Sequence, residues 1–226
     1  MTKHKVGIVG VGQSPRNDIM PGMKEILGKN IEVIEKGALD GLSLRMIQSL
    51  YPREGMTIIC TRLSNGTQVV VAEEELIPRV QAKIKELNRE EVELIILLCT
   101  GHFPRFESSC FLLEAQKVVD RCVEALVCDQ DTIGLFVPLP EQRETAKQKL
   151  SYITPHIVVV SASPYGSMEE LIRAAQILKA ENINLVVMHC MGYTKNHRKV
   201  VKEVTGKPVL LANSIVARTA AELIQG

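Results

Sequence analysis

Two cysteines stand at the same place in two similar segments, LIILLCTGHF at 94–103 and LVVMHCMGYT at 185–194. In each segment an aliphatic run leads to the cysteine, one variable residue and a glycine. Short apolar runs that end at a glycine are typical of strands buried on both faces of a parallel sheet. Ligands bind beyond the carboxyl ends of such strands, so we expect Cys99 and Cys190 to lie beside a ligand. The alternative is that both are small buried apolar residues.

Two thiols on opposite sides of a small ligand suit a reaction at a carbon atom next to a carboxylate. One thiolate removes the α-proton from one face, and the other thiol protonates the opposite face. Main-chain amides and hydroxyls must then stabilise the charge that builds on the carboxylate. Thr100-Gly101 and Met191-Gly192 supply such amides, and a helix that begins after the turn would lower the pKa of the thiol. His102 and His189 either activate a thiol or are hydrogen-bonded structural residues.

Other polar residues also follow predicted strands. Ser14 and Arg16 follow the first strand, where Arg16 could hold a carboxylate through two hydrogen bonds. Asn213 and Ser214 follow the last strand, where they cap a helix or contact an anion. The predicted substrate-binding residues are Ser14, Arg16, Thr100, Gly101, Met191, Gly192, Tyr193, Asn213 and Ser214. Whether Asp40, Arg62 and Tyr165 line the cleft is left open.

Strand-like runs alternate with segments of helical period, which predicts an α/β fold with mainly parallel strands. The predicted strands are 6–9, 31–35, 57–60, 68–71, 94–98, 132–137, 157–161, 185–188 and 208–211. The predicted helices are 73–88, 114–128, 141–150, 168–181 and 214–224. Asn65-Gly66 between two strand runs indicates a hairpin.

The order of the elements repeats along the chain. The first two strands of each half have nearly the same spacing, whereas the two cysteines lie closer together by about the length of the hairpin and its flanks. We therefore predict two pseudo-symmetric α/β lobes with a ligand cleft between them. The first comprises 1–105 and 214–226 with the hairpin inserted, and the second comprises 106–213.

Composition limits the class of protein. The net charge of +1 and the 4% aromatic content argue against nucleic acid as a partner. No apolar stretch approaches the roughly 20 residues that span a bilayer, and no signal peptide is evident, which predicts a cytoplasmic protein without a membrane partner. The six cysteines are irregularly spaced and form no C-x-x-C pair, so we expect reduced thiols and no metal site. The expected partner is a small carboxylate or other small anion, and homo-oligomerisation is left open.

Several short segments carry a resemblance to a known family. GQSPRNDI at 12–19, GALDGLSL at 37–44, TRLSNG at 61–66, VPLPEQ at 137–142, SASPYG at 161–166 and both cysteine segments resemble the AroM family, within the aspartate/glutamate racemase-like superfamily. The resemblance covers nearly the whole chain. It implies cofactor-independent racemases, cis–trans isomerases and decarboxylases that act on small carboxylates.

The chain departs from the amino-acid racemases of that superfamily. Those enzymes usually follow the first cysteine with Asn-Thr and the second with Thr-His, where this chain has Thr100-Gly101 and Met191-Gly192. Residues that would handle a substrate amino group are therefore not evident, and an amino acid is a less expected substrate than the superfamily suggests. The sequence predicts a cofactor-independent racemase or isomerase that acts on a small carboxylate, with Cys99 and Cys190 as the catalytic residues.

Three alternatives stay open. The first is a small-anion-binding protein that does not turn over its ligand, because a fold does not fix a function. The second is a related lyase or decarboxylase. The third is a nucleotide-binding protein, since Gly10-Val11-Gly12 follows a strand and Glu35 ends the next one, although Pro15 replaces the third glycine of that pattern.

Overall fold

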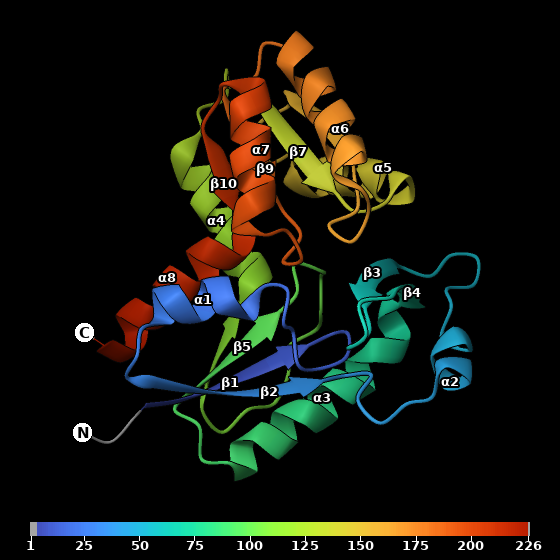
Figure 1. Ribbon diagram of the computed structural model, residues 1–226, viewed down its shortest axis with the longest axis vertical. Coiled ribbons are helices and arrows are strands. Elements are labelled where there is room, and N and C mark those ends of the chain that lie inside the picture. The colour runs from blue at the N-terminus through green and yellow to red at the C-terminus, as the bar shows by residue number, and fades with distance from the viewer. Residues whose placement is uncertain (1–3, 226) are drawn as a thin grey trace. The chain divides into compact units, whose positions relative to one another are not determined.

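The computed structural model describes residues 4–225, which form two compact units. The first unit contains the described residues up to Gln116 together with those from Val216 onward, and the second contains Lys117–Ile215. Each unit has a four-stranded parallel sheet with helices packed against it (Figure 1). The chain is therefore α/β with mainly parallel sheets, as predicted.

The sheet of the first unit has the strand order β2-β1-β5-β6. Its strands are β1 (His4–Gly10), β2 (Ile31–Gly37), β5 (Leu94–Leu98) and β6 (Phe111–Glu114). Helix α3 (Glu73–Arg89) covers one face, and α1 (Met20–Leu27) lies with the end of α8 (Ala212–Gln225) against the other (Figure 1). Every residue of β5 is buried, as expected for a strand with both faces covered.

The sheet of the second unit has the strand order β10-β9-β7-β8. Its strands are β7 (Ile133–Val137), β8 (Ile157–Ser161), β9 (Leu185–Met188) and β10 (Val209–Leu211). Its helices are α4 (Ala115–Leu126), the short η1 (Pro140–Gln142), α5 (Arg143–Leu150), α6 (Met168–Ala180) and α7 (Lys195–Thr205). Strands β1, β2, β5 and β6 thus correspond in chain order and sheet position to β7, β8, β9 and β10, which confirms the predicted pseudo-symmetry.

The first half carries an additional hairpin between its second and third sheet strands. Strands β3 (Ile58–Arg62) and β4 (Gln68–Ala72) pair antiparallel, and α2 (Leu44–Gln48) precedes them. The connecting turn has Gly66 at a φ of 96°, a left-handed conformation that a glycine adopts without strain. In the second half α6 alone connects the corresponding strands β8 and β9. The hairpin predicted from Asn65-Gly66 is therefore an insertion in the first half.

The boundary between the units lies after Gln116 rather than at residue 105. Strand β6 is the reason, because it pairs with β5 and so joins the first sheet. Sequence analysis missed this four-residue strand and began the second lobe at residue 106. The last helix of each half of the chain therefore belongs mainly to the unit formed by the other half. Helix α4 belongs to the second unit from Lys117, and α8 belongs to the first unit from Val216. A hydrogen bond from Gln225 Nε2 to the carbonyl of Leu27 joins α8 to α1.

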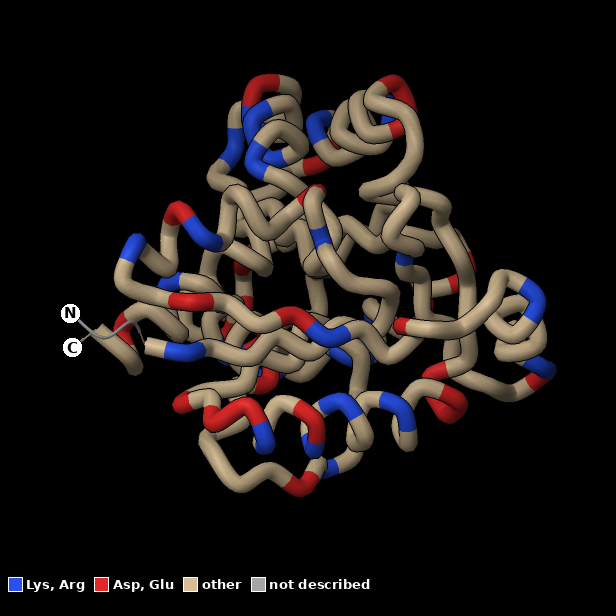
Figure 2. The backbone as a smooth tube through the Cα atoms, turned by 60° about the horizontal axis from the view of Figure 1, so that its bottom comes forward, with Lys and Arg blue, Asp and Glu red and all other residues tan. Residues whose placement is uncertain are grey.

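Sequence analysis also missed α1, α2 and α7. Helix α7 buries only Val201 and Thr205, so its sequence has little apolar periodicity. A capping box nevertheless marks its start, since Thr194 Oγ1 accepts from the N–H of His197 and His197 Nδ1 accepts from the N–H of Thr194. Acidic and basic residues are interspersed along the helices of both units (Figure 2). Among the described residues, none of the helices combines the length and apolar character that crossing a bilayer requires.

Candidate functional site

The two cysteines occupy matching turns. Cys99 directly follows β5, and Cys190 follows β9 after one intervening residue, and the two strands hold the same position in their sheets. The N–H of Gly101 donates to Cys99 Sγ at 3.3 Å, and the N–H of Gly192 donates to Cys190 Sγ at 3.4 Å. Neither cysteine forms a disulfide, and both are partly buried. A hydrogen bond from a main-chain amide favours the thiolate form, so each turn can support an ionised thiol.

The surroundings of the two turns differ. After Cys190 the chain enters α7 at Lys195, as the predicted pairing of a thiol with a helix N-terminus requires. After Cys99 no helix follows before β6, so that prediction is wrong for the first turn. The N-terminus of α3 lies beside that turn instead, because a Cβ atom on Gly101 would stand 2.8 Å from Glu73 Oε2. A Cβ atom on Gly192 would stand 2.6 Å from the hydroxyl oxygen of Tyr165.

Sequence analysis did not single out Glu73, which is only 7% exposed. Its position in the acidic run Glu73-Glu74-Glu75 reads as an ordinary helix start, because carboxylates are favoured in the first turn of a helix. Only the tertiary structure shows that one of these three carboxylates is buried beside the Cys99 turn. The contact that identifies it comes from a residue 28 positions later in the chain, Gly101.

Several predicted site residues of the second unit build the turn rather than face outward. The side chain of Met191 is buried, and that of Tyr193 is fully buried with its hydroxyl donating to the carbonyl of Ala162 at 2.6 Å. Asn213 Nδ2 donates to the carbonyls of Met191 and Tyr193 at 3.0 and 2.5 Å. Helix α8 begins at Ala212, so Asn213 and the buried Ser214 lie in its first turn instead of capping it.

The loop after β1 directs its donors at carboxylates of the chain itself. The N–H and hydroxyl of Ser14 donate to Asp40 at 2.7 and 2.6 Å, and the N–H of Arg16 donates to Glu35 at 2.8 Å. Asp40 therefore fixes the loop, and the expectation that Ser14 offers these donors to an anion is not met. Helix α1 begins only at Met20, and the Glu35 carboxylate accepts a hydrogen bond from this loop. Both observations disfavour a dinucleotide site, which needs a helix N-terminus directly after the glycine turn.

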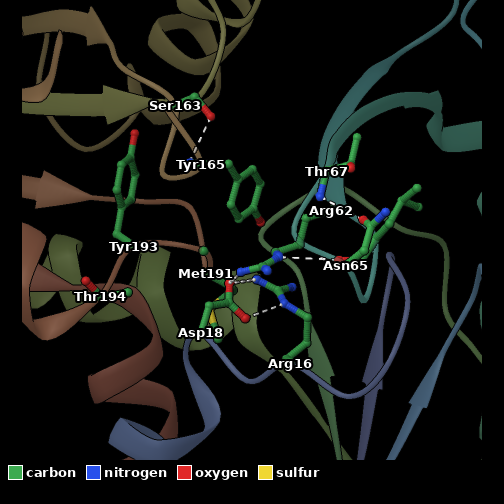
Figure 3. A network of polar contacts seen from close by, with 12 residues as sticks. Arg16, Asp18, Arg62, Asn65, Thr67, Ser163, Tyr165, Met191, Tyr193 and Thr194 are labelled. Carbon is green, nitrogen blue, oxygen red and sulfur yellow. Dashed lines mark hydrogen bonds and ion pairs between the residues drawn. The ribbon is translucent and has the colours of Figure 1, made fainter. Parts of the chain in front are cut away.

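Arg16 also binds a carboxylate of its own loop. Its Nε and Nη2 atoms donate to the two oxygens of Asp18 at 3.0 and 2.9 Å, and Arg62 Nη1 lies 3.2 Å from Asp18 Oδ2 (Figure 3). The Arg16 side chain is 6% exposed and that of Arg62 is 20% exposed, so Arg62 is the more accessible guanidinium. Burial opposes ionisation of Asp18, but the hydrogen bond and charge of Arg16, with the charge of Arg62, lower its pKa below the ordinary value.

The inserted hairpin brings Arg62 to this loop. The N–H of Gln13 donates to the carbonyl of Arg62 at 3.1 Å, and the N–H of Ser64 donates to Gln13 Oε1 at 3.1 Å. Farther back along β3, Ile59 Cδ1 lies 3.1 Å from the position of a Cβ atom on Gly101. Strand β3 therefore runs along the carboxyl ends of β1 and β5, between the Arg16 loop and the Cys99 turn.

A buried polar cluster includes His189, the residue directly before Cys190. His189 Nε2 lies 2.7 Å from Asp120 Oδ1, and Lys149 Nζ lies 3.7 Å from Asp120 Oδ2. All three side chains are at least about nine-tenths buried. Burial lowers the pKa of His189 below its ordinary value, the charge of Lys149 acts in the same direction, and the hydrogen bond with Asp120 opposes them. In the first half Leu98 holds the place before the cysteine, and His102 is exposed.

The described part of the chain contains no group of three or more His, Cys, Asp or Glu side chains arranged to hold a metal ion. None of the six cysteines forms a disulfide. Sequence analysis left open whether Tyr165 lines the cleft. Its hydroxyl group lies against Gly192 of the second cysteine turn. Its N–H donates to Ser163 Oγ at 3.1 Å (Figure 3).

Solved structures of enzymes share this fold at low sequence identity. A liganded double mutant of arylmalonate decarboxylase has a TM-score of 0.62 and 13% identity, covering 98% of this chain and 92% of that one. Allantoin racemase from Pseudomonas fluorescens has a TM-score of 0.62 and 10% identity, covering 97% and 90%. Glutamate racemase from Aquifex pyrophilus has a TM-score of 0.60 and 13% identity, covering 97% and 84%. At these identities the likeness establishes the two-lobed fold.

No curated protein matches the chain. The model of the family described as AroM protein matches residues 6–224, which is nearly all of the sequence and includes both cysteine turns. The chain belongs to the AroM protein family.

Proposed function

We propose that the protein is a cofactor-independent racemase or isomerase that acts on a small carboxylate through Cys99 and Cys190. The observation that carries the proposal is the matched pair of thiol turns. Equivalent strands end in them, and in each turn the N–H two residues after the cysteine donates to the sulfur. The racemases and the decarboxylase of the same fold support a reaction of this class.

The chemistry follows from the thiols. A thiolate removes the proton from the carbon atom next to the substrate carboxylate, and the other thiol protonates the opposite face of the same carbon. Catalysis requires stabilisation of the negative charge that develops on the carboxylate between these two steps. The main-chain amides of the two turns are the donors that we assign to this role. The mechanism requires both sulfurs to reach the same ligand within hydrogen-bonding distance of the transferred proton.

The turns also bear on the substrate. The side chains of Met191 and Tyr193 are buried, so the second turn offers a ligand main-chain groups rather than side-chain ones. In the first turn Thr100 adds a hydroxyl. Ser14 and Arg16 direct donors at the chain's own carboxylates, and Arg62 is the more accessible of the two guanidinium groups beside Asp18. We propose a small carboxylate without an amino group as the substrate.

Hydrogen–deuterium exchange tests the proposal directly. The protein is incubated in deuterium oxide with a panel of small chiral carboxylates, and loss of the α-proton is followed by NMR. We expect exchange with the wild-type protein, loss of full turnover in Cys99→Ala and in Cys190→Ala, and unchanged exchange in Cys122→Ala, a partly buried cysteine on α4. Undiminished exchange in the Cys99→Ala, Cys190→Ala double variant would refute the mechanism.

The same experiment distinguishes two other functions. A decarboxylase needs only one essential thiol, so a single cysteine variant with full activity toward a malonate-type substrate would favour it. A binding protein without turnover would bind a carboxylate without exchange.

A further inference from the structure

The two thiol turns share a main-chain geometry but face different chemical groups. In each turn a glycine two residues after the cysteine packs so closely against a polar side chain that a Cβ atom would overlap it. At Gly101 that group is the carboxylate of Glu73, at 2.8 Å, and at Gly192 it is the phenol of Tyr165, at 2.6 Å. The glycine of the first turn therefore lies against a carboxyl side chain and that of the second turn against a phenol, so the two cysteine turns have chemically different surroundings.

Two features of the fold act in opposite directions on the charge of Glu73, since burial opposes ionisation of its carboxyl group and its place in the helix favours it. It is the first residue of the 17-residue helix α3, where unpaired N–H groups and the helix dipole stabilise a negative charge. Its neighbours Glu74 and Glu75 lie in the same helical turn but are more exposed. Because Glu73 is 7% exposed, solvent would screen a charge on Glu73 less than one on its neighbours, and such a charge would act on the adjacent Cys99 turn.

From this asymmetry we infer that the two thiols differ in protonation state in the resting protein, which sets their roles in the forward step; in the reverse step the roles exchange, as microscopic reversibility requires. Glu73 keeps the thiol of Cys99 protonated, so that Cys99 is the proton donor and Cys190 is the base. In the forward step the Cys190 thiolate takes the α-proton and becomes a thiol, and the Cys99 thiol gives its proton to the carbanion and becomes a thiolate. Exchange of both protons with water restores the starting state. The inference rests on the proposed function and makes Glu73 a positioning residue.

Other titratable groups on the neighbouring elements also act on the two turns. For the first turn they are Glu73 on α3, His102 in the turn itself, and Cys60 and Arg62 on β3, the strand whose Ile59 lies beside Gly101. Arg62 favours a thiolate, and Asp18 offsets its charge only in part, because Arg16 pairs with the same carboxylate. Those around the second turn are His189, Asp120 on α4, Lys149 on α5, Tyr165, and His197 on α7. Asp120 and Lys149 form an ion pair, and burial disfavours the charged form of His189.

The size of the effect can be bounded from the geometry. The Gly101 contacts place Glu73 Oε2 within about 9 Å of Cys99 Sγ when standard bond lengths are added. At that distance, with an effective dielectric constant of about 20, a unit negative charge raises the pH at which half of the thiol is ionised by at least about one pH unit. At a fixed pH below that midpoint, a rise of one pH unit makes the fraction of Cys99 present as thiolate about tenfold lower.

The experiment measures the ionisation of each thiol directly. The intact protein reacts with iodoacetamide over a range of pH, and peptide mass spectrometry gives the alkylation rate of each cysteine. The midpoint of each rate profile reports ionisation independently of accessibility, because only the thiolate reacts. We expect Cys190 to have the lower midpoint in the wild-type protein. Glu73→Gln should lower the midpoint of Cys99 by about one pH unit and leave that of Cys190 unchanged.

Glu74→Gln is the matched control. It removes a carboxylate from the adjacent position of the same helical turn, where the side chain is exposed, and should move neither midpoint. The inference is overturned if Cys99 ionises at or below the pH at which Cys190 does, or if Glu73→Gln moves neither profile or both. The wild-type comparison decides even if Glu73→Gln fails to fold. These rates need no substrate, so the inference can fail while carboxylate exchange persists, and the proposed function can fail while the thiols remain unequal.

Discussion

The buried histidine beside Cys190 predicts how stability depends on pH. Burial lowers the pKa of His189 in the folded protein, whereas in the unfolded chain it titrates near its ordinary value of 6.5. Well above that pH the ring is neutral in both states and contributes no pH dependence. As the pH falls through about 6.5, the unfolded chain takes up a proton that the folded protein excludes. The free energy of unfolding therefore falls as the pH is lowered.

The slope follows from linkage. One proton bound only by the unfolded state decreases the free energy of unfolding by up to about 1.4 kcal/mol per pH unit. His189→Gln removes this titration and keeps an amide that can donate to Asp120, the partner that lies 2.7 Å from His189 Nε2. We therefore expect the free energy of unfolding of His189→Gln to depend less steeply on pH below about 6.5 than that of the wild-type protein.

Urea denaturation followed by circular dichroism at half-unit steps from pH 7.5 to 5.5 measures this slope. His156→Gln is the control, because His156 belongs to the same unit and is exposed. Its pH dependence should match that of the wild-type protein. Identical slopes for His189→Gln and the wild-type protein would show that His189 does not remain neutral in the folded state, and the reasoning from burial would be wrong.

Two substitutions test how the site is built. Gly37→Ala should destabilise the protein by about 3 kcal/mol in urea denaturation, because its Cβ atom would stand 2.4 Å from the carbonyl oxygen of Gly12 and 2.7 Å from the nitrogen of Ser14. Gly10→Ala at the register partner of Gly37 meets nothing within 4 Å and should cost much less, and equal losses would contradict the packing argument. Asn213→Ala should cost about 2 kcal/mol by leaving the carbonyls of Met191 and Tyr193 without their donor. The exposed Asn17→Ala should cost almost nothing, and a similarly small loss at Asn213 would show that the turn does not depend on this side chain.

The sequence alone determined the class of fold and the placement of the two thiols. Buried parallel strands such as β5 read as continuous aliphatic runs, and a glycine after the cysteine marks the turn at the carboxyl end. The repeat of this pattern at Cys99 and Cys190 predicted equivalent strands, and the matching strand orders confirm it. The hairpin could also be predicted from the sequence, because Asn65-Gly66 specifies a tight turn locally.

Local patterns could not reveal which polar groups pair with one another. Ser14 and Arg16 read as anion ligands, yet residues distant in sequence, Asp40 and Glu35, accept from them. Strand β6 and helix α7 were missed because a short strand and a weakly apolar helix carry little periodicity of their own. Glu73 and Asp120 reach the cysteine turns only through tertiary packing. Short-range patterns thus determined where the two thiols stand in the fold, and contacts between distant segments decided the charges that surround them.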